Sequence, residues 1–108
     1  MSLPVLLTSD APRDLNELYD YVTEHNSPQK ADHLLEQIQK IFSTSSKFPE
    51  RGVYPKELLE LGIREYREIF LKPYRIIYRV MEKNVYVLLL VDGRRDLQSL
   101  LQRRLLEA

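Results

Sequence analysis

Cysteine and tryptophan are absent from this 108-residue chain, which also has only two histidines and three glycines. Without cysteine, the protein forms no disulfide, thiolate metal site or cysteine nucleophile. The two histidines, His25 and His33, do not have the spacing of metal ligands, so we expect no metal. The isolated glycines, Gly52, Gly62 and Gly93, build no phosphate-binding loop, so we expect no nucleotide cofactor.

Long apolar runs are also missing. No run approaches the roughly 20 residues of a membrane-spanning helix, and residues 1–4 lack the basic and apolar regions of a signal peptide. We therefore expect a cytoplasmic protein that does not enter a membrane. The length, with 44% hydrophobic and 30% charged residues, is typical of one globular domain over residues 1–108.

Charge is unevenly divided along the chain, although the formal net charge is zero. Residues 1–62 hold six Lys/Arg and ten Asp/Glu, whereas residues 63–108 hold ten and six. A neutral protein is a poor general nucleic-acid binder, because phosphate affinity scales with the number of charges neutralised. A basic surface in the second half can still attract an anionic partner.

Residues 63–96 contain three runs of β-forming residues, separated by Lys72-Pro73 and by residues 82–84. Turn residues between such runs predict a three-stranded antiparallel meander. Alternation along the middle run places Arg75 and Arg79 on one face of the sheet. We therefore predict a sheet with one guanidinium-bearing face and one apolar face, the latter formed by Tyr74, Ile76, Tyr78 and Val80.

The remaining patterns predict one more strand and three helices. Residues 5–7 are short and apolar, as in a strand, and Ser9 or Asp10 can cap the helix that follows, which should end near residues 24–26. Ser27 starts a second helix, residues 43–55 read as an irregular connection, and Asp96 can cap a last helix. The order β-α-α-β-β-β-α predicts an α+β domain, an antiparallel sheet with a helical hairpin packed on one face.

Catalytic patterns are nearly absent, since no serine or threonine has the context of an activated nucleophile. One reaction stays possible. RNA can be cleaved without metal or histidine if arginines stabilise the transition state and Tyr66, Tyr78 or Asp92 moves protons. The other interpretation of the tyrosines is that they are strand residues of the core. The available cations are Arg64, Arg67, Arg75, Arg79, Arg94 and Arg95.

Nearly the whole chain resembles the ParE/RelE superfamily of bacterial type II toxins, and it is closest to the ParE (plasmid stabilisation) branch. The resemblance rests on an ordered series of motifs, of which the last two are the strongest. In chain order, the motifs are Asp14-Leu15 and Ala31 in the helices, then 48–52 (FPERG), 64–67 (REYR), 73–80 (PYRIIYRV) and 93–97 (GRRDL).

The resemblance implies a small toxin that is held inactive by a cognate antitoxin encoded beside it. ParE-like members are associated with poisoning DNA gyrase, whereas RelE-like members cut messenger RNA on the ribosome. The cleaving members use basic residues of the sheet and usually a tyrosine or histidine near the C-terminus. This chain has neither after Arg95, and Asp92 stands where many ParE-like relatives carry histidine. Asp92 can simply pair with Arg94 or Arg95.

These observations favour a non-enzymatic inhibitor of DNA gyrase. Two alternatives remain open, a ribosome-dependent endoribonuclease and a degenerate binding module without toxicity. We expect contact with nucleic acid only in a complex with the antitoxin or the ribosome, and a homodimer or a heterotetramer with the antitoxin is possible. The residues predicted to bind the antitoxin or the target are Arg64, Arg67, Arg75, Arg79, Arg94, Arg95 and Asp96.

Overall fold

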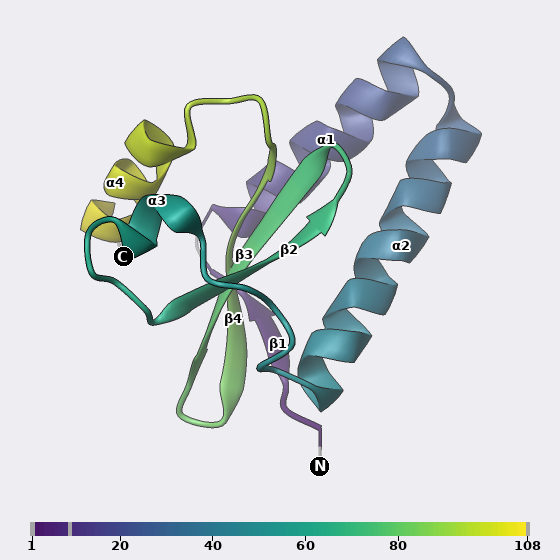
Figure 1. Ribbon diagram of the computed structural model, residues 1–108. Helices are drawn as coiled ribbons and strands as arrows, with labels where there is room; N and C mark the ends of the chain where they lie inside the picture. Colours follow the sequence, from purple (N-terminus) through teal and green to yellow (C-terminus); the bar gives the residue numbers. More distant parts are fainter. Residues whose placement is uncertain (1, 9, 108) are drawn as a thin grey trace.

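The computed structural model describes residues 2–8 and 10–107. It confirms the predicted α+β fold and the predicted order of elements, and a short helix, α3, lies within residues 56–62, where the sequence indicates a possible helical turn (Figure 1). No helix within these residues is long and apolar enough to cross a membrane. The elements are β1 (Val5–Leu7), α1 (Ala11–His25), α2 (Pro28–Lys47), α3 (Lys56–Leu59), β2 (Tyr66–Leu71), β3 (Tyr74–Met81), β4 (Asn84–Asp92) and α4 (Leu97–Glu107).

The four strands form one sheet in the order β1-β4-β3-β2. The meander β2-β3-β4 is antiparallel, as predicted, and its turns fall at Lys72-Pro73, a cis peptide bond, and at Glu82-Lys83. Both residues of the second turn have positive φ, 54° and 63°, which matches the twist of a two-residue hairpin. The short strand β1 pairs with β4 in parallel, so the sheet is mixed and not wholly antiparallel.

The predicted helical hairpin covers one face of the sheet, where α1 and α2 lie side by side (Figure 1). Its apolar stripes bury Val22, Leu34 and Ile38 against Ile76 and Tyr78 of β3. Asp10 occupies the cap position of α1, but its side chain makes no capping hydrogen bond, and Ser9 lies outside the described residues. The Ser27 side chain accepts a hydrogen bond from the Lys30 backbone N–H at 3.1 Å, which is the capping bond expected at the start of α2.

The second face of the sheet corrects the prediction that only one of its two faces is apolar. It carries a second apolar core, in which Ile77 and Leu89 pack under the leucines of α4 and under Leu58 of α3. Arg75 and Arg79 do lie on this face, but they flank a core and do not form an open basic surface. The register shifts between Ile77 and Tyr78, and Leu88 and Leu89 both join this second core.

Helix α2 is longer than predicted, because residues 43–47 are helical and not irregular. Their serines and threonine are weak helix formers, so sequence alone favoured a connection. In the structure, the Leu3 backbone N–H donates to the Ser46 carbonyl oxygen at 2.9 Å, and Ser45 is buried. Contact with the N-terminal segment thus stabilises a turn that the local sequence disfavours.

A buried ion pair joins α1, β4 and α4. Because β1 ends at Leu7, β4 has no neighbouring strand on that side beyond Val87. Asp14 accepts a hydrogen bond from the Leu90 backbone N–H at 3.1 Å, and Arg104 donates to the Leu88 carbonyl oxygen at 3.1 Å. The two side chains also bind each other at 2.6 and 3.0 Å. They therefore satisfy backbone groups that a strand would otherwise pair.

We expect Asp14→Ala to destabilise the protein by about 3 kcal/mol, because it removes the nearer of two carboxylates from Arg104, which keeps Asp10 at 3.6 Å, and leaves the Leu90 N–H without its acceptor. Urea unfolding followed by circular dichroism measures this loss. The matched control is Asp20→Ala, which removes an exposed carboxylate from the same helix and should cost less than about 0.5 kcal/mol. Equal losses in the two variants would contradict a structural role for the ion pair.

Candidate functional site

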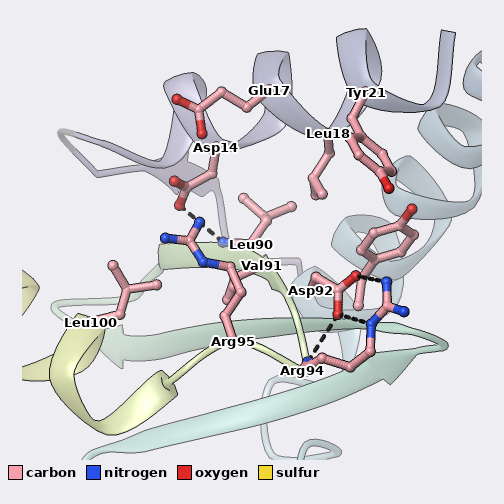
Figure 2. Close-up of a pocket in the computed structure, with 11 residues that line it drawn as sticks. Asp14, Glu17, Leu18, Tyr21, Leu90, Val91, Asp92, Arg94, Arg95 and Leu100 are labelled. Carbon is pink, nitrogen blue, oxygen red and sulfur yellow. Dashed lines mark hydrogen bonds and ion pairs between the residues drawn. The ribbon is translucent and has the colours of Figure 1, made fainter. Parts of the chain in front are cut away.

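A groove lies between α1 and the segment that joins β4 to α4 (Figure 2). Its volume is about 390 Å³. One wall is a single stripe of α1 that includes Glu17, Leu18 and Tyr21, because residues three and four apart share a helix face. The other wall carries Arg94 and Arg95. The groove is the place where two of the predicted binding residues meet a helix surface.

Asp92 and Arg94 form an ion pair at the rim of this groove (Figure 2). The Arg94 guanidinium donates to both carboxylate oxygens, at 2.6 and 3.0 Å, and its backbone N–H donates to Asp92 Oδ1 at 2.9 Å. The hydrogen bonds from Arg94 lower the pKa of Asp92 to about 2. The sequence allows Asp92 to pair with Arg94 or Arg95. In the structure it pairs with Arg94, whose side chain is 78% exposed.

Arg95 links this groove to a second hollow of about 340 Å³ between α1 and α4. The two cavities share Asp14, Glu17, Arg95 and Leu100, so they adjoin each other along α1, and together they are called the groove below. The Arg95 side chain extends toward α1 near Asp14 (Figure 2). The second hollow is strongly charged, and its remaining lining residues are Asp10, Arg13, Arg103 and Arg104.

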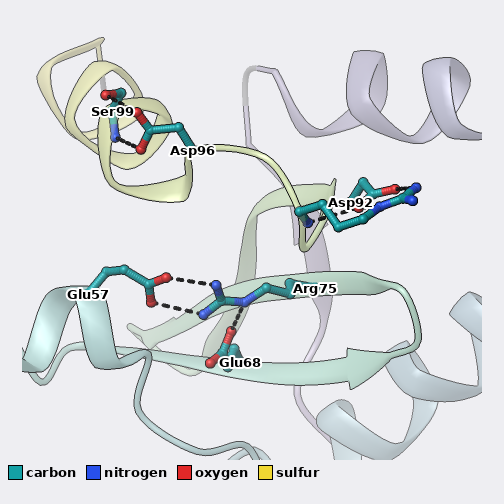
Figure 3. A network of polar contacts seen from close by, with 7 residues as sticks. Glu57, Glu68, Arg75, Asp92, Asp96 and Ser99 are labelled. Atoms are coloured by element: carbon teal, nitrogen blue, oxygen red, sulfur yellow. Dashed lines mark hydrogen bonds and ion pairs between the residues drawn. The ribbon is translucent and has the colours of Figure 1, made fainter.

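Arg75 is buried, with 7% of its surface exposed, between two glutamates (Figure 3). Its Nε donates to Glu68 at 2.7 Å, and its two terminal nitrogens donate to Glu57 at 2.8 and 3.0 Å. Hydrogen bonding from Arg75 lowers the pKa of Glu57, and bonding to Glu57 raises the pKa of Arg75. The network ties α3 to β2 and β3, so the structure assigns Arg75 to the scaffold.

The side chains of Arg67 and Arg79 also make contacts within the protein. Arg67 donates to the carbonyl oxygens of Glu50 and Gly52 at 3.1 and 2.9 Å, and to the Tyr54 hydroxyl at 3.1 Å. These bonds hold the connection between α2 and α3 against β2.

The Arg79 guanidinium lies 5.6 Å from the centre of the Tyr66 ring, within the range of a cation–π contact. Arg64 is exposed. Asp96 caps α4, where it accepts from the backbone N–H and the hydroxyl of Ser99 at 3.2 and 2.8 Å (Figure 3). The predicted binding residues therefore do not form one surface, and Arg94 and Arg95 are the two that line the groove.

Tyr78, one of the candidate proton carriers, belongs to the core. Its hydroxyl donates to the Pro49 carbonyl oxygen at 2.7 Å and accepts from the Gly52 N–H at 3.0 Å. A Cβ atom at position 52 would lie 2.6 Å from that hydroxyl, so the close approach requires glycine. Tyr66 is also buried. Among residues 2–8 and 10–107, no group of three His, Asp or Glu side chains could hold a metal ion.

The family model described as "ParE toxin of type II toxin-antitoxin system, parDE" matches residues 5–97 of this chain. The chain belongs to the ParE toxin family. Toxin ParE3 of Caulobacter vibrioides (strain ATCC 19089 / CIP 103742 / CB 15) is 29% identical over 100 residues, which cover 93% of this chain and 96% of that protein. The predicted ParE/RelE resemblance is thereby confirmed.

Two solved structures share the fold of this ParE family member. The chromosomal ParDE toxin-antitoxin system from P. aeruginosa superposes with a TM-score of 0.68 at 19% identity, covering 84% of this chain and 96% of that one. A mutant of the E. coli toxin RelE in the free state superposes with a TM-score of 0.63 at 17% identity, covering 95% and 98%. Both likenesses concern the fold alone.

We expect the Asp92 carboxyl to titrate near pH 2 in the folded protein and Arg94→Ala to return its pKa toward 3.8. Because the folded-state pKa is depressed, the ion pair stabilises the fold above pH 4 and this contribution is lost as pH falls toward 2. Titration of the side-chain carboxyl carbon by NMR measures both values. Arg51→Ala, which removes an exposed arginine of the α2–α3 connection, should leave the pKa unchanged. A wild-type pKa near 3.8 would refute the pairing.

Proposed function

We propose that this protein is a toxin that inhibits DNA gyrase and is neutralised by a cognate antitoxin. The observation that carries the proposal is the match of the ParE family model to residues 5–97. A matching ParE3 toxin and a fold shared with a ParDE system support it. Inhibition of gyrase and binding of an antitoxin come from the ParE resemblance and are tested below.

The arrangement of the sheet favours a protein-binding toxin over an RNA-cleaving one. An arginine stabilises a phosphorane only if its guanidinium can reach the developing charge. Arg75 instead binds Glu57 and Glu68, so its charge is already neutralised. Tyr66 and Tyr78 are buried and cannot reach a substrate without unpacking the core.

Asp92 is equally unsuited to proton transfer in RNA cleavage. Its pKa of about 2 keeps it ionised at neutral pH and makes it a weak base. None of the three candidate proton carriers, Tyr66, Tyr78 and Asp92, is therefore suited to proton transfer. Recognition of a partner protein is therefore the role that fits the arginines that remain exposed. The growth assay below distinguishes a toxin from a binding module without toxicity.

We expect the purified protein to inhibit DNA supercoiling by gyrase, or to stabilise gyrase–DNA cleavage complexes, at micromolar concentration. Prior incubation with the antitoxin encoded beside the gene should abolish the effect, because the partner covers the toxin surface. The same protein, folded by circular dichroism and inactive toward gyrase, would contradict the proposal.

Induction in growing cells distinguishes the two alternatives. Growth arrest with intact transcripts, measured by primer extension on messenger RNA, agrees with a gyrase target. Ribosome-dependent cuts within the transcripts would instead identify an endoribonuclease. Normal growth after induction of soluble protein would identify a binding module without toxicity.

A further inference from the structure

We propose that the groove between α1 and the β4–α4 junction binds an acidic segment of the antitoxin, with Arg95 as its central contact. The inference rests on the proposed function, since it names the surface that the neutralising partner occupies. Three properties of the groove carry it, namely its length, its charge after internal pairing, and its apolar end.

The length of the groove suits a short peptide segment. Its α1 wall runs from Arg13 to Tyr21, about 12 Å of helix at 1.5 Å per residue. About four residues of extended chain cover that distance at 3.3 Å each. The two hollows together are long and open, which suits a stretch of backbone with several side chains better than a compact small molecule.

The charge of the groove selects an acidic segment. Asp14 is bound to Arg104 at 2.6 Å, Asp10 lies 3.6 Å from the same guanidinium, and Asp92 is bound to Arg94 at 2.6 Å. Two arginines thus compensate two of these three carboxylates, because Asp10 and Asp14 share Arg104. Over both hollows, five lining arginines face four lining carboxylates, which leaves a net charge of +1.

Three arginines around the groove remain without such a partner. Within residues 2–8 and 10–107, Arg13, Arg95 and Arg103 form no ion pair, and Glu17 is the lining carboxylate that also forms none. They come from three different elements, α1, the β4–α4 junction and α4, and they border one hollow. Like charges held close together repel each other, and carboxylates of a partner would relieve that repulsion.

The apolar end of the groove supplies a site for one large side chain. Leu18, Tyr21 and Tyr74 line it, and Tyr21 is 51% exposed although it stacks on His25 at 4.1 Å. Burial raises the pKa of the Tyr74 hydroxyl, as expected for a ring set into a cavity. An aliphatic or aromatic side chain next to the acidic residues would bury these rings further.

The experiment measures affinity by calorimetry for the purified antitoxin encoded beside the gene and for a synthetic peptide of its most acidic segment. We expect Arg95→Glu to weaken binding of both about tenfold or more. Arg51→Glu makes the same charge change at an exposed site outside the groove and should weaken binding less than about threefold. Wild-type affinity should fall as salt rises, and Tyr21→Ala should weaken binding of the peptide.

The outcomes separate this inference from the proposed function. If wild-type protein binds the antitoxin but Arg95→Glu and Arg51→Glu behave alike, the groove is not the binding site, although the toxin-antitoxin assignment stands. If wild-type protein binds no antitoxin, both the groove inference and the toxin-antitoxin assignment fail. If Arg95→Glu keeps full affinity for the antitoxin but no longer inhibits gyrase, the groove belongs to the target and the inference is overturned. Arg95→Gln provides the same test if charge reversal impairs folding.

Discussion

The buried pair of Asp14 and Arg104 fixes the relation between the two layers of helices and the sheet. Strand β4 runs to Asp92, whereas its neighbour β1 ends at Leu7, and unpaired backbone groups cannot be buried without cost. The ion pair meets this need with one carboxylate from α1 and one guanidinium from α4, bound to Leu90 and Leu88 of β4. Because these three elements also form the walls of the groove, one polar contact stabilises the fold and sets the shape of the groove.

The arginines of the second half of the chain differ in role because their neighbours differ. Arg75 meets two carboxylates and becomes a buried cross-link, and Arg67 meets backbone carbonyl oxygens and holds a connection in place. Arg94 has one carboxylate two residues away and stays exposed. Arg95 forms no ion pair with a described carboxylate and extends into the groove (Figure 2). The basic excess of this half is thus mostly internal, and its exposed remainder gathers at the β4–α4 junction.

Local patterns in the sequence were sufficient for the fold class, because strands and helices are encoded by periodicity over a few residues. The meander, the hairpin and the cap at Asp96 follow from neighbours in sequence. The pair of Asp14 and Arg104 could not be predicted, since the two residues are 90 positions apart. The same holds for Glu57, which lies 18 positions from Arg75. The predicted set of arginines therefore could not distinguish scaffold residues from surface residues.

Two features of the sequence correct the predicted set of binding residues. Glu68 shares the alternation of Tyr66 on β2, which places a carboxylate on the same face as Arg75 once β2 and β3 pair. The leucines of α4 likewise need an apolar surface, and the hairpin occupies the other face of the sheet. Both signals argue that the second face is a core with an internal ion-pair network and not an open catalytic surface. The exposed guanidinium of Arg95, which forms no ion pair within the described part of the chain, lies at the edge of that core, where α1, β4 and α4 meet.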